Sequence, residues 1–241
     1  MHAYIFTYRI FPAINSTLYI VATPIGNLAD FSERAVQVLN QADLIACEDT
    51  RTSSTLLRHY GIEKPTISFH QHNEHTRVDK LMDELRNGRN IAIISDAGMP
   101  GISDPGFLAV RQAHRNGIRV VTIPGPSAAV SALVASGLPC DRFVFEGFLP
   151  QKKGRQTRLK LLAAEERTLI VFESPHRIIK LVDEIVTHFG PDRLMAVARE
   201  LTKKFEEIIR APASEVKKIF EDRASVKGEI VVVVAGTGYK E

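Results

Sequence analysis

Short apolar segments alternate with helix-like stretches along the first half of the chain, and this alternation constrains the fold most strongly. The apolar segments cover residues 18–23, 44–47, 66–69, 91–94 and 119–123, and each is followed directly by a polar residue or a proline. Apolar residues with helical spacing come after each of them. Strands that alternate with helices in this way predict a parallel α/β sheet.

The helical stretches have recognisable ends. Ser32 and Ser127 stand where a helix cap is expected, and glycines follow the other stretches. We expect helices after Ser32, at 52–60, around 78–85, at 107–116 and at 128–136.

A second α/β unit is predicted from residue 139 onward. Strands are expected at 143–148, 168–172, 194–198, 205–210 and 230–234, and helices through Lys160, from Pro175 through His188, and at 214–221. We therefore predict an extension outside the fold at 1–16, an N-terminal α/β domain at 17–138 and a C-terminal α/β domain at 139–241.

Composition excludes several classes of protein. The 241 residues are 44% hydrophobic and carry a net charge of +3, which suits a globular chain and is compatible with nucleic acid. No run reaches the length of a membrane span. The two cysteines, Cys47 and Cys140, form neither a disulfide framework nor a metal-binding spacing, so a reducing, cytoplasmic location is expected.

The stretch 95–106, SDAGMPGISDPG, joins a predicted strand to a predicted helix. It holds three glycines, two prolines and two carboxylates. Glycines allow close backbone approach and prolines stiffen a loop, so the stretch predicts a ligand pocket at the end of a parallel sheet. Its spacing matches neither a P-loop nor a dinucleotide fingerprint. Asp104 is expected to be a structural carboxylate at the start of the following helix.

Charged clusters follow other predicted strands. Glu48, Asp49 and Arg51 follow 44–47, and a cluster from Glu173 to Arg177 follows 168–172. Functional groups gather at such strand ends, although these charges could also form salt bridges around helix ends.

Two further groups admit two interpretations each. His70, His72 and His75 could hold a metal or could form a polar loop. The basic residues of 151–158 could bind phosphates or could be a solvated start of a helix.

Seven ordered motifs resemble the small-subunit ribosomal RNA methyltransferases of the tetrapyrrole methylase-like family. They are LYIVATPIGNLADFSERAVQVLNQADLIACEDTR, SDAGMPGISDPG, IPGPSA, EGFLP, TLIVFESPHRI, ARELTKKFEE and KGEIVVVVAG. The resemblance implies a two-domain fold with a mainly parallel N-terminal sheet, a mixed C-terminal sheet and S-adenosylmethionine in the cleft between the domains. It also implies a homodimer and 2′-O-methylation of a cytidine in the decoding region of 16S ribosomal RNA. Members of the family continue beyond 230–234 with a small helical region, so RNA contacts from that region are expected to be missing here.

The resemblance also implies site residues. The donor-binding positions of the family fall on Pro24, Asp96, Ala97, Gly98, Ile102, Ser103, Ser127, Ala128, Leu149 and Glu173. No metal is implied.

A ribose hydroxyl is a poor nucleophile, so a base or a polarising cation is expected beside it. The base candidates are Glu48, Asp49 and Glu200. The cation candidates are Arg51, Arg177, Arg199 and Lys203.

Three other functions stay open at this point. They are a methyltransferase of the same fold acting on a small tetrapyrrole-like substrate, a metal-dependent hydrolase using the three histidines, and a non-catalytic RNA-binding module.

Overall fold

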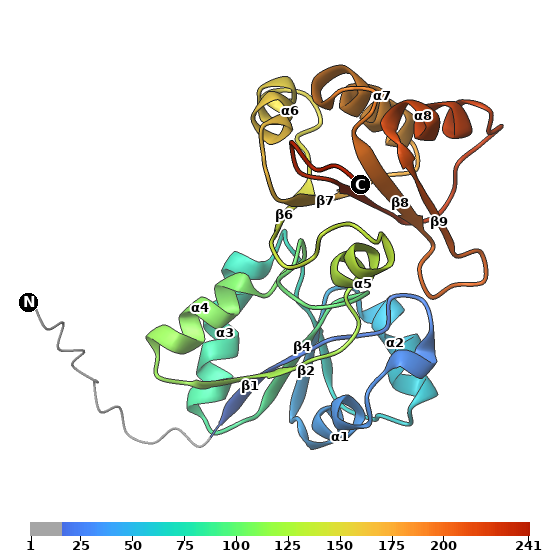
Figure 1. Cartoon of the computed structure of the whole chain (residues 1–241). Helices are drawn as coiled ribbons and strands as arrows, with labels where there is room; N and C mark the ends of the chain where they lie inside the picture. Colours follow the sequence, from blue (N-terminus) through green and yellow to red (C-terminus); the bar gives the residue numbers. More distant parts are fainter. Residues whose placement is uncertain (1–15) are drawn as a thin grey trace, which may run out of the picture. The chain divides into compact units, whose positions relative to one another are not determined.

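The computed structural model describes residues 16–241, which form two compact units (Figure 1). The first unit holds the described residues up to Thr23 together with Phe31–Gly125, and the second holds Pro24–Asp30 and Pro126–Glu241. The expected extension lies outside the described residues except for Ser16. Ser16 is 1% exposed and its hydroxyl donates to the Leu85 carbonyl, so it belongs to the fold rather than to an extension.

The first unit contains the parallel sheet that the sequence predicts. Its strands are β1 (Thr17–Val21), β2 (Leu44–Cys47), β3 (Thr66–Ser68), β4 (Ile91–Ile94) and β5 (Arg119–Ile123), in the order β3-β2-β4-β1-β5. All pairs are parallel, with β1 between β4 and β5 and β4 between β1 and β2. The three inner strands are buried on both faces, which is why they read as continuous apolar runs.

Helices cover both faces of this sheet. The apolar sides of α1 (Glu33–Gln41) and α2 (Thr50–His59) pack on one face, and those of α3 (Glu74–Arg86) and α4 (Phe107–Arg115) pack on the other (Figure 1). The helices that follow the neighbouring strands β1 and β4 in the chain, α1 and α4, lie on opposite faces of the sheet. Such a switch point is the usual position of a ligand in an open α/β sheet.

The second unit contains the mixed sheet. Its strands are β6 (Phe143–Phe148), β7 (Thr168–Glu173), β8 (Leu194–Arg199), β9 (Glu207–Pro212) and β10 (Ile230–Val234), in the order β6-β7-β10-β8-β9. Only β6 and β7 pair in parallel, and the remaining pairs are antiparallel.

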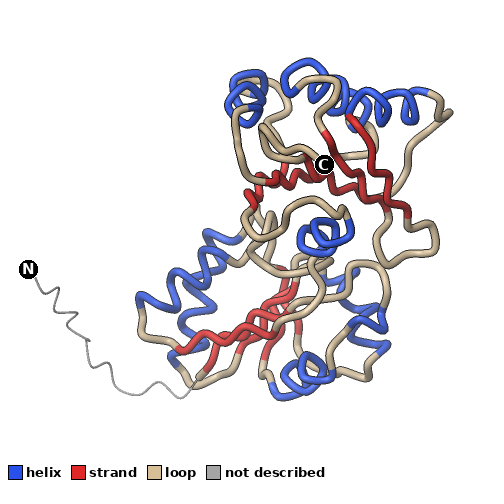
Figure 2. Tube along the Cα trace, viewed as in Figure 1, coloured by secondary structure: helices blue, strands red, loops and turns tan. Residues whose placement is uncertain are grey.

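Helices also cover both faces of the second sheet (Figure 2). α5 (Ala128–Ala135) packs on one face, and α6 (Arg155–Ala163), α7 (Ile178–Phe189) and α8 (Ala213–Glu221) pack on the other. A short 3₁₀ helix, η1 (Leu28–Asp30), also belongs to this unit.

The division between the units differs from the predicted boundary at residue 139. The chain passes into the second unit at Pro126, because Ala129, Ala132 and Leu133 of α5 join the core formed by β7, β8 and β10. Pro24–Asp30 also belongs to the second unit, although it follows β1 directly.

The helix starts expected after Ser32 and Ser127 are confirmed, and the start expected at Pro175 was wrong. The Ser32 hydroxyl accepts from the Ala35 amide, as predicted. Ser127 occupies the N-cap position of α5, but its side chain makes no capping bond. Pro175 lies in a turn before α7, which begins only at Ile178.

No helix in the part of the chain that the structure describes is long and apolar enough to cross a membrane.

Candidate active site

Hydrogen bonds join the residues that follow β2 and β4 at the carboxyl edge of the first sheet. These strands are neighbours, with Cys47 opposite Ile94, so the residues that follow them meet. The Asp96 amide donates to Glu48 Oε2 at 3.3 Å, and the Asp49 amide donates to Asp96 Oδ1 at 3.2 Å. Charged residues that follow two separate strands therefore lie close together at this edge.

The loop after β4 is also fastened to the end of β1. The Thr23 amide donates to the Gly98 carbonyl at 2.8 Å, and the Gly98 amide donates back to Thr23 at 3.1 Å. The Thr23 hydroxyl donates to the Ser95 carbonyl. The Gly98 amide is therefore already paired within the chain.

The loop 95–106 needs its glycines. Gly98, Gly101 and Gly106 have φ angles of 82°, 85° and 139°, which residues with a Cβ rarely adopt. Ser103 has a φ of 65° without being glycine. Such strain is typically found at functional sites. Ile102 beside it is 44% exposed and offers an apolar surface.

The carboxyl groups of Glu48, Asp96 and Asp104 lie in this region, and the pKa of each is raised above its ordinary value. Burial is the main cause for each of them. Asp104 is shifted most, to a pKa of about 7, because the charges of Glu48 and Asp96 add to the effect of burial. Concentrated negative charge of this kind favours a cationic ligand.

The role expected for Asp104 was wrong. The start of α4 is held by Glu74, whose Oε1 accepts from the Gly106 amide at 3.0 Å and the Leu108 amide at 3.1 Å. Among the described residues, Asp104 accepts no hydrogen bond from the backbone amides at the start of α4. Its carboxyl group instead interacts with the charges of Glu48 and Asp96. Asp104 therefore joins the candidate site.

Asp104 should make stability fall as pH rises. Its carboxyl pKa is about 7 in the folded chain against an ordinary 3.8, so between these values the folded state keeps a proton that the unfolded state has lost. We expect Asp104→Asn to gain about 1–2 kcal/mol over the wild type between pH 5 and pH 8, allowing for solvent screening. Chemical denaturation at both pH values measures this gain. A difference between the two proteins that does not change with pH would contradict the raised pKa.

Asp49 and Arg51 form an exposed pair. The Asp49 side chain caps α2 through the Arg51 amide and accepts from the Arg51 guanidinium, with the closest approach at 2.7 Å. The hydrogen bond from the Arg51 side chain lowers the pKa of Asp49 to about 2. Asp49 is therefore a poor base. Arg51 is paired with Asp49, but its side chain is 90% exposed and is accessible to an anion.

The histidines do not build a metal centre. His70 is tied to Asn73, whose side chain accepts from the His70 amide and lies 3.2 Å from the His70 ring nitrogen. Between residues 16 and 241 no group of three or more histidine, cysteine, aspartate or glutamate side chains has an arrangement that could hold a metal ion. The arrangement gives no support to the metal-dependent hydrolase.

In the second unit, Glu200 and Lys203 form a second charged group. Lys203 Nζ lies 3.0 Å from Glu200 Oε1 and 3.0 Å from Glu229 Oε2. The Glu229 amide and Lys203 lower the pKa of Glu200, so Glu200 is also a poor base. Arg199 is paired with Glu207.

The backbone around Glu200 and Lys203 is tightly constrained. Glu200 has a φ of 53°, and a Cβ at Gly228 would lie 2.4 Å from the Glu200 carboxyl carbon. A Cβ at Gly26 would lie 2.4 Å from Lys203 Cγ. Because Gly228 and Gly26 have no side chain, the backbone passes close to the side chains of Glu200 and Lys203.

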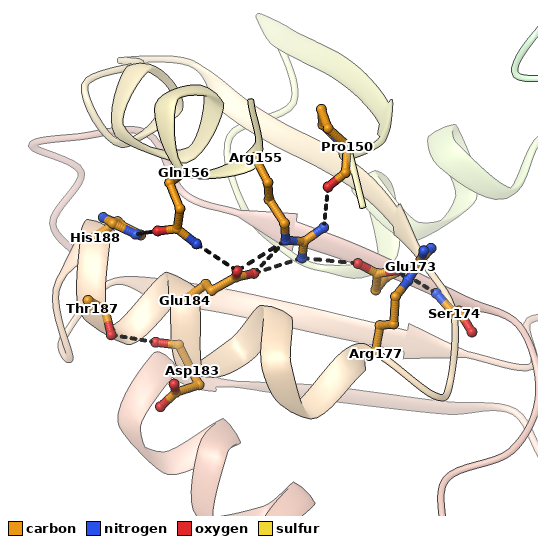
Figure 3. A network of polar contacts seen from close by, with 10 residues as sticks. All are labelled: Pro150, Arg155, Gln156, Glu173, Ser174, Arg177, Asp183, Glu184, Thr187 and His188. Carbon is orange, nitrogen blue, oxygen red and sulfur yellow. Dashed lines mark hydrogen bonds and ion pairs between the residues drawn. The ribbon is translucent and has the colours of Figure 1, made fainter. Parts of the chain in front are cut away.

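Glu173 and Arg177 belong to a buried ionic network (Figure 3). The Glu173 side chain is 1% exposed, and its Oε1 accepts from the Ser174 amide and from Arg177 Nε at 2.7 Å. Its other oxygen faces Arg155 at 3.3 Å. Both oxygens are thus engaged within the protein, and Glu173 has little capacity left for a donor molecule.

The basic segment 151–158 is mostly not a phosphate-binding surface. Arg155 is buried and Arg158 is paired with Glu146, so among the four basic residues of this described segment only Lys152 and Lys153 are exposed without an ion pair.

The structure places the expected donor-binding residues in both units. Asp96, Ala97, Gly98, Ile102 and Ser103 share one loop of the first unit, whereas Pro24, Ser127, Ala128, Leu149 and Glu173 belong to the second. Leu149 is 3% exposed and packs in the core of its unit, so it offers little surface to an adenine.

The family model of the Tetrapyrrole (Corrin/Porphyrin) Methylases matches residues 17–217. The chain belongs to the tetrapyrrole methylase family. It is 51% identical over 221 residues to Ribosomal RNA small subunit methyltransferase I of Escherichia coli O157:H7, covering 91% of this chain and 77% of that protein.

A second relative and a solved structure agree with this membership. The protein of the same name from Pasteurella multocida is 51% identical, with 92% of this chain and 80% of that protein covered. The crystal structure of uroporphyrin-III-C-methyltransferase from Thermus thermophilus superposes with a TM-score of 0.64 at 18% identity, over 91% and 94% of the two chains. That likeness confirms the fold class of two α/β units with a parallel and a mixed sheet.

Methyltransferases of the tetrapyrrole methylase family use S-adenosylmethionine, and this chain is a methyltransferase. The first unit fits that molecule chemically. Its carboxyl groups suit a sulfonium and an ammonium group, and the exposed Ile102 suits an apolar part. When bound, S-adenosylmethionine supplies the activated methyl group, and the residues of the chain hold and orient it.

Proposed function

We propose that this methyltransferase transfers a methyl group from S-adenosylmethionine to the ribose 2′-hydroxyl of a cytidine in the decoding region of 16S ribosomal RNA. One observation carries this proposal: the sequence is 51% identical, over 91% and 92% of its length, to two proteins named Ribosomal RNA small subunit methyltransferase I. Methyl transfer from a sulfonium needs accurate placement of the donor and the acceptor oxygen more than it needs covalent chemistry.

We infer that the loop 95–106 binds the donor. Asp96 presents a partly exposed carboxylate whose Oδ2 has no partner among the described residues. Ser103 and the glycines give the loop a backbone shape that other sequences would rarely adopt. Asp96 would attract the positive groups of the donor.

Glu48 is the strongest of the three base candidates named from the sequence. Burial raises its carboxyl pKa, whereas pairing lowers the pKa values of Asp49 and Glu200. A general base works best when its pKa approaches the working pH. We therefore propose that Glu48 accepts the proton of the ribose hydroxyl.

The cations of the two units would bind the RNA backbone. Arg51 is almost fully exposed. Arg177 keeps its two terminal nitrogens clear of hydrogen bonds with the described residues. A planar guanidinium can hold a phosphate through two parallel bonds.

The proposal also includes the cellular setting. The substrate would be the small ribosomal subunit, which places the enzyme in the cytoplasm, and the active species would be a homodimer. Sedimentation of the purified chain measures its oligomeric state, and a strictly monomeric active enzyme would contradict this part of the proposal.

A methyl-transfer assay tests the function. Small ribosomal subunits that lack the modification should gain a labelled methyl group, and mapping should place it on a cytidine ribose. A folded protein that binds the donor but methylates only a tetrapyrrole-like molecule would overturn the RNA assignment. A folded protein that binds no donor would overturn the whole proposal.

Arg177→Ala should weaken use of the RNA much more than use of the donor. Loss of one guanidinium–phosphate contact is expected to raise KM for subunits roughly tenfold, equivalent to about 1.4 kcal/mol, with donor affinity unchanged. Steady-state kinetics and calorimetric titration measure the two quantities. Arg167→Ala is a matched control, because Arg167 is an arginine of the same unit that pairs with neighbouring Glu165. An unchanged KM in Arg177→Ala would remove Arg177 from the RNA contact.

A further inference from the structure

Arg155 lies at the centre of the buried network in the second unit (Figure 3). Its side chain is 3% exposed, although it comes from a segment rich in basic residues. Arg155 Nε donates to both oxygens of Glu184, at 3.1 and 2.8 Å, and Nη2 lies 2.7 Å from Glu184 Oε2. Its Nη1 donates to the Pro150 carbonyl at 3.2 Å.

The network continues from Arg155 to Glu173. Arg155 Nη2 donates to Glu173 Oε2 at 3.3 Å, and the other Glu173 oxygen binds Arg177 Nε. Glu173 therefore bridges a buried arginine and a partly exposed one. Because both of its oxygens are occupied and its side chain is 1% exposed, Glu173 has a single well-defined orientation.

Glu184 is the second carboxylate that binds the Arg155 guanidinium. Its side chain is 9% exposed and also accepts from the Gln156 side chain at 3.0 Å. Gln156 in turn lies 2.7 Å from the ring nitrogen of His188. The Arg155 guanidinium thus has partners from α7, from β7 and from the loop between β6 and α6, and these bonds leave it little freedom to move.

Arg177 is the member of this network that meets solvent. Its side chain is 28% exposed, and only Nε donates to another group of the described chain. The bond from Nε to Glu173 fixes the plane of the guanidinium while the two terminal nitrogens stay available. An arginine held in this way loses less conformational freedom when it binds an anion.

We propose that Arg155 is a positioning residue that acts through Glu173 to hold the Arg177 guanidinium ready for a phosphate of the RNA substrate. The inference rests on the proposed function, since the phosphate belongs to the RNA. Arg155 itself touches no substrate. It keeps the Glu173 carboxylate in the orientation that binds Arg177 Nε.

A double-mutant cycle tests this role in the full chain. Arg155→Lys, Arg177→Ala and the double variant are compared with the wild type for affinity to unmodified small subunits over a range of salt concentrations. Lysine keeps the buried charge but cannot serve Glu184, Glu173 and Pro150 together. Arg155→Lys alone should weaken binding about five- to tenfold and lower the salt slope by roughly 0.7–0.9, the value for one phosphate contact.

The double variant decides the question. If Arg155 acts through Arg177, adding Arg155→Lys to Arg177→Ala should weaken binding by about twofold or less and leave the salt slope unchanged. If Arg155 had only a structural role, Arg155→Lys would weaken subunit binding equally in the wild type and in Arg177→Ala and would leave the salt slope unchanged in both. This result would overturn the inference.

Two further variants keep the result interpretable. Arg193→Lys changes another partly buried arginine of the second unit, which donates to the Ala235 and Ala163 carbonyls, and its effect should be independent of Arg177. If Arg155→Lys does not fold, Glu184→Gln repeats the cycle, because it weakens the hold on Arg155 while keeping an acceptor. Additive losses with Glu184→Gln would overturn the inference in the same way.

The test separates this inference from the proposed function. A wild-type protein that binds the donor but does not bind or methylate subunits would overturn both. A wild-type protein that methylates subunits and gives an additive cycle would overturn only the role of Arg155.

Discussion

Asp96→Asn should weaken binding of S-adenosylmethionine by about 30-fold or more. Asparagine has nearly the same shape and can still accept from the Asp49 amide, so the loop should keep its conformation. The negative charge that attracts the positive groups of the donor is lost. Truncating one partner of a charge pair of this kind costs about 2–5 kcal/mol, and the lower value suits a carboxylate that is partly exposed.

Calorimetric titration of both proteins with S-adenosylmethionine measures the change. Asp79→Asn is the matched control, because it removes the same charge from an exposed position on α3 of the same unit. Its donor affinity should equal that of the wild type. Intact affinity in Asp96→Asn would show that the loop 95–106 does not hold the donor through this carboxylate.

Arg155→Met should destabilise the protein by about 3–5 kcal/mol. The substitution leaves Glu184, whose side chain is 9% exposed, without its cation. It leaves Glu173, whose side chain is 1% exposed, with Arg177 as its one remaining cation among the described residues. A buried carboxylate without a partner is costly, because it has lost its hydration and gained nothing in return. The loss is expected to come mainly from the buried charge of Glu184 left without a cation, and from the incomplete pairing of Glu173, rather than from the ionic bonds themselves.

Chemical denaturation followed by far-UV circular dichroism measures this loss, since the chain has no tryptophan. Arg158→Met is the control on the same helix, where the arginine pairs with Glu146 but its side chain is 40% exposed. That variant should lose less than about 1 kcal/mol. Equal losses in the two variants would contradict the importance of burial. Adding Glu184→Met to Arg155→Met should recover part of the stability, because one stranded charge is removed.

Several elements could be predicted from the sequence because local composition determines them. The strands at 44–47, 119–123, 143–148 and 230–234 have the expected bounds, since each is a short run rich in branched or aromatic residues between breaking residues. Strand alternation also predicted the parallel sheet. Glu48 and Asp96 meet because β2 and β4 are neighbours in that sheet and end at the same edge.

Other features depend on partners far away in the chain. The burial of Arg155 results from Glu184, which lies 29 residues further on, so a basic segment alone does not reveal it. The assignment of α5 to the second unit depends on packing against β7, β8 and β10. Glu74 replaced Asp104 as the anchor of α4 for the same reason. A weak signal was present for Glu184, which falls among the apolar positions Leu181 and Ile185 of an otherwise amphipathic helix.

The position of β10 in the second sheet sets an order of folding during synthesis. This strand, with the sequence IVVVV, comes after the other strands of its sheet in sequence, yet it lies between β7 and β8 and is buried along its whole length. Until residues 230–234 have left the ribosome, β7 and β8 each present an unpaired apolar edge, which favours aggregation. The sheet of the first unit needs only residues up to 123 and can form earlier. A nascent chain stalled before residue 230 should therefore carry a folded first sheet and an incomplete, chaperone-dependent second one.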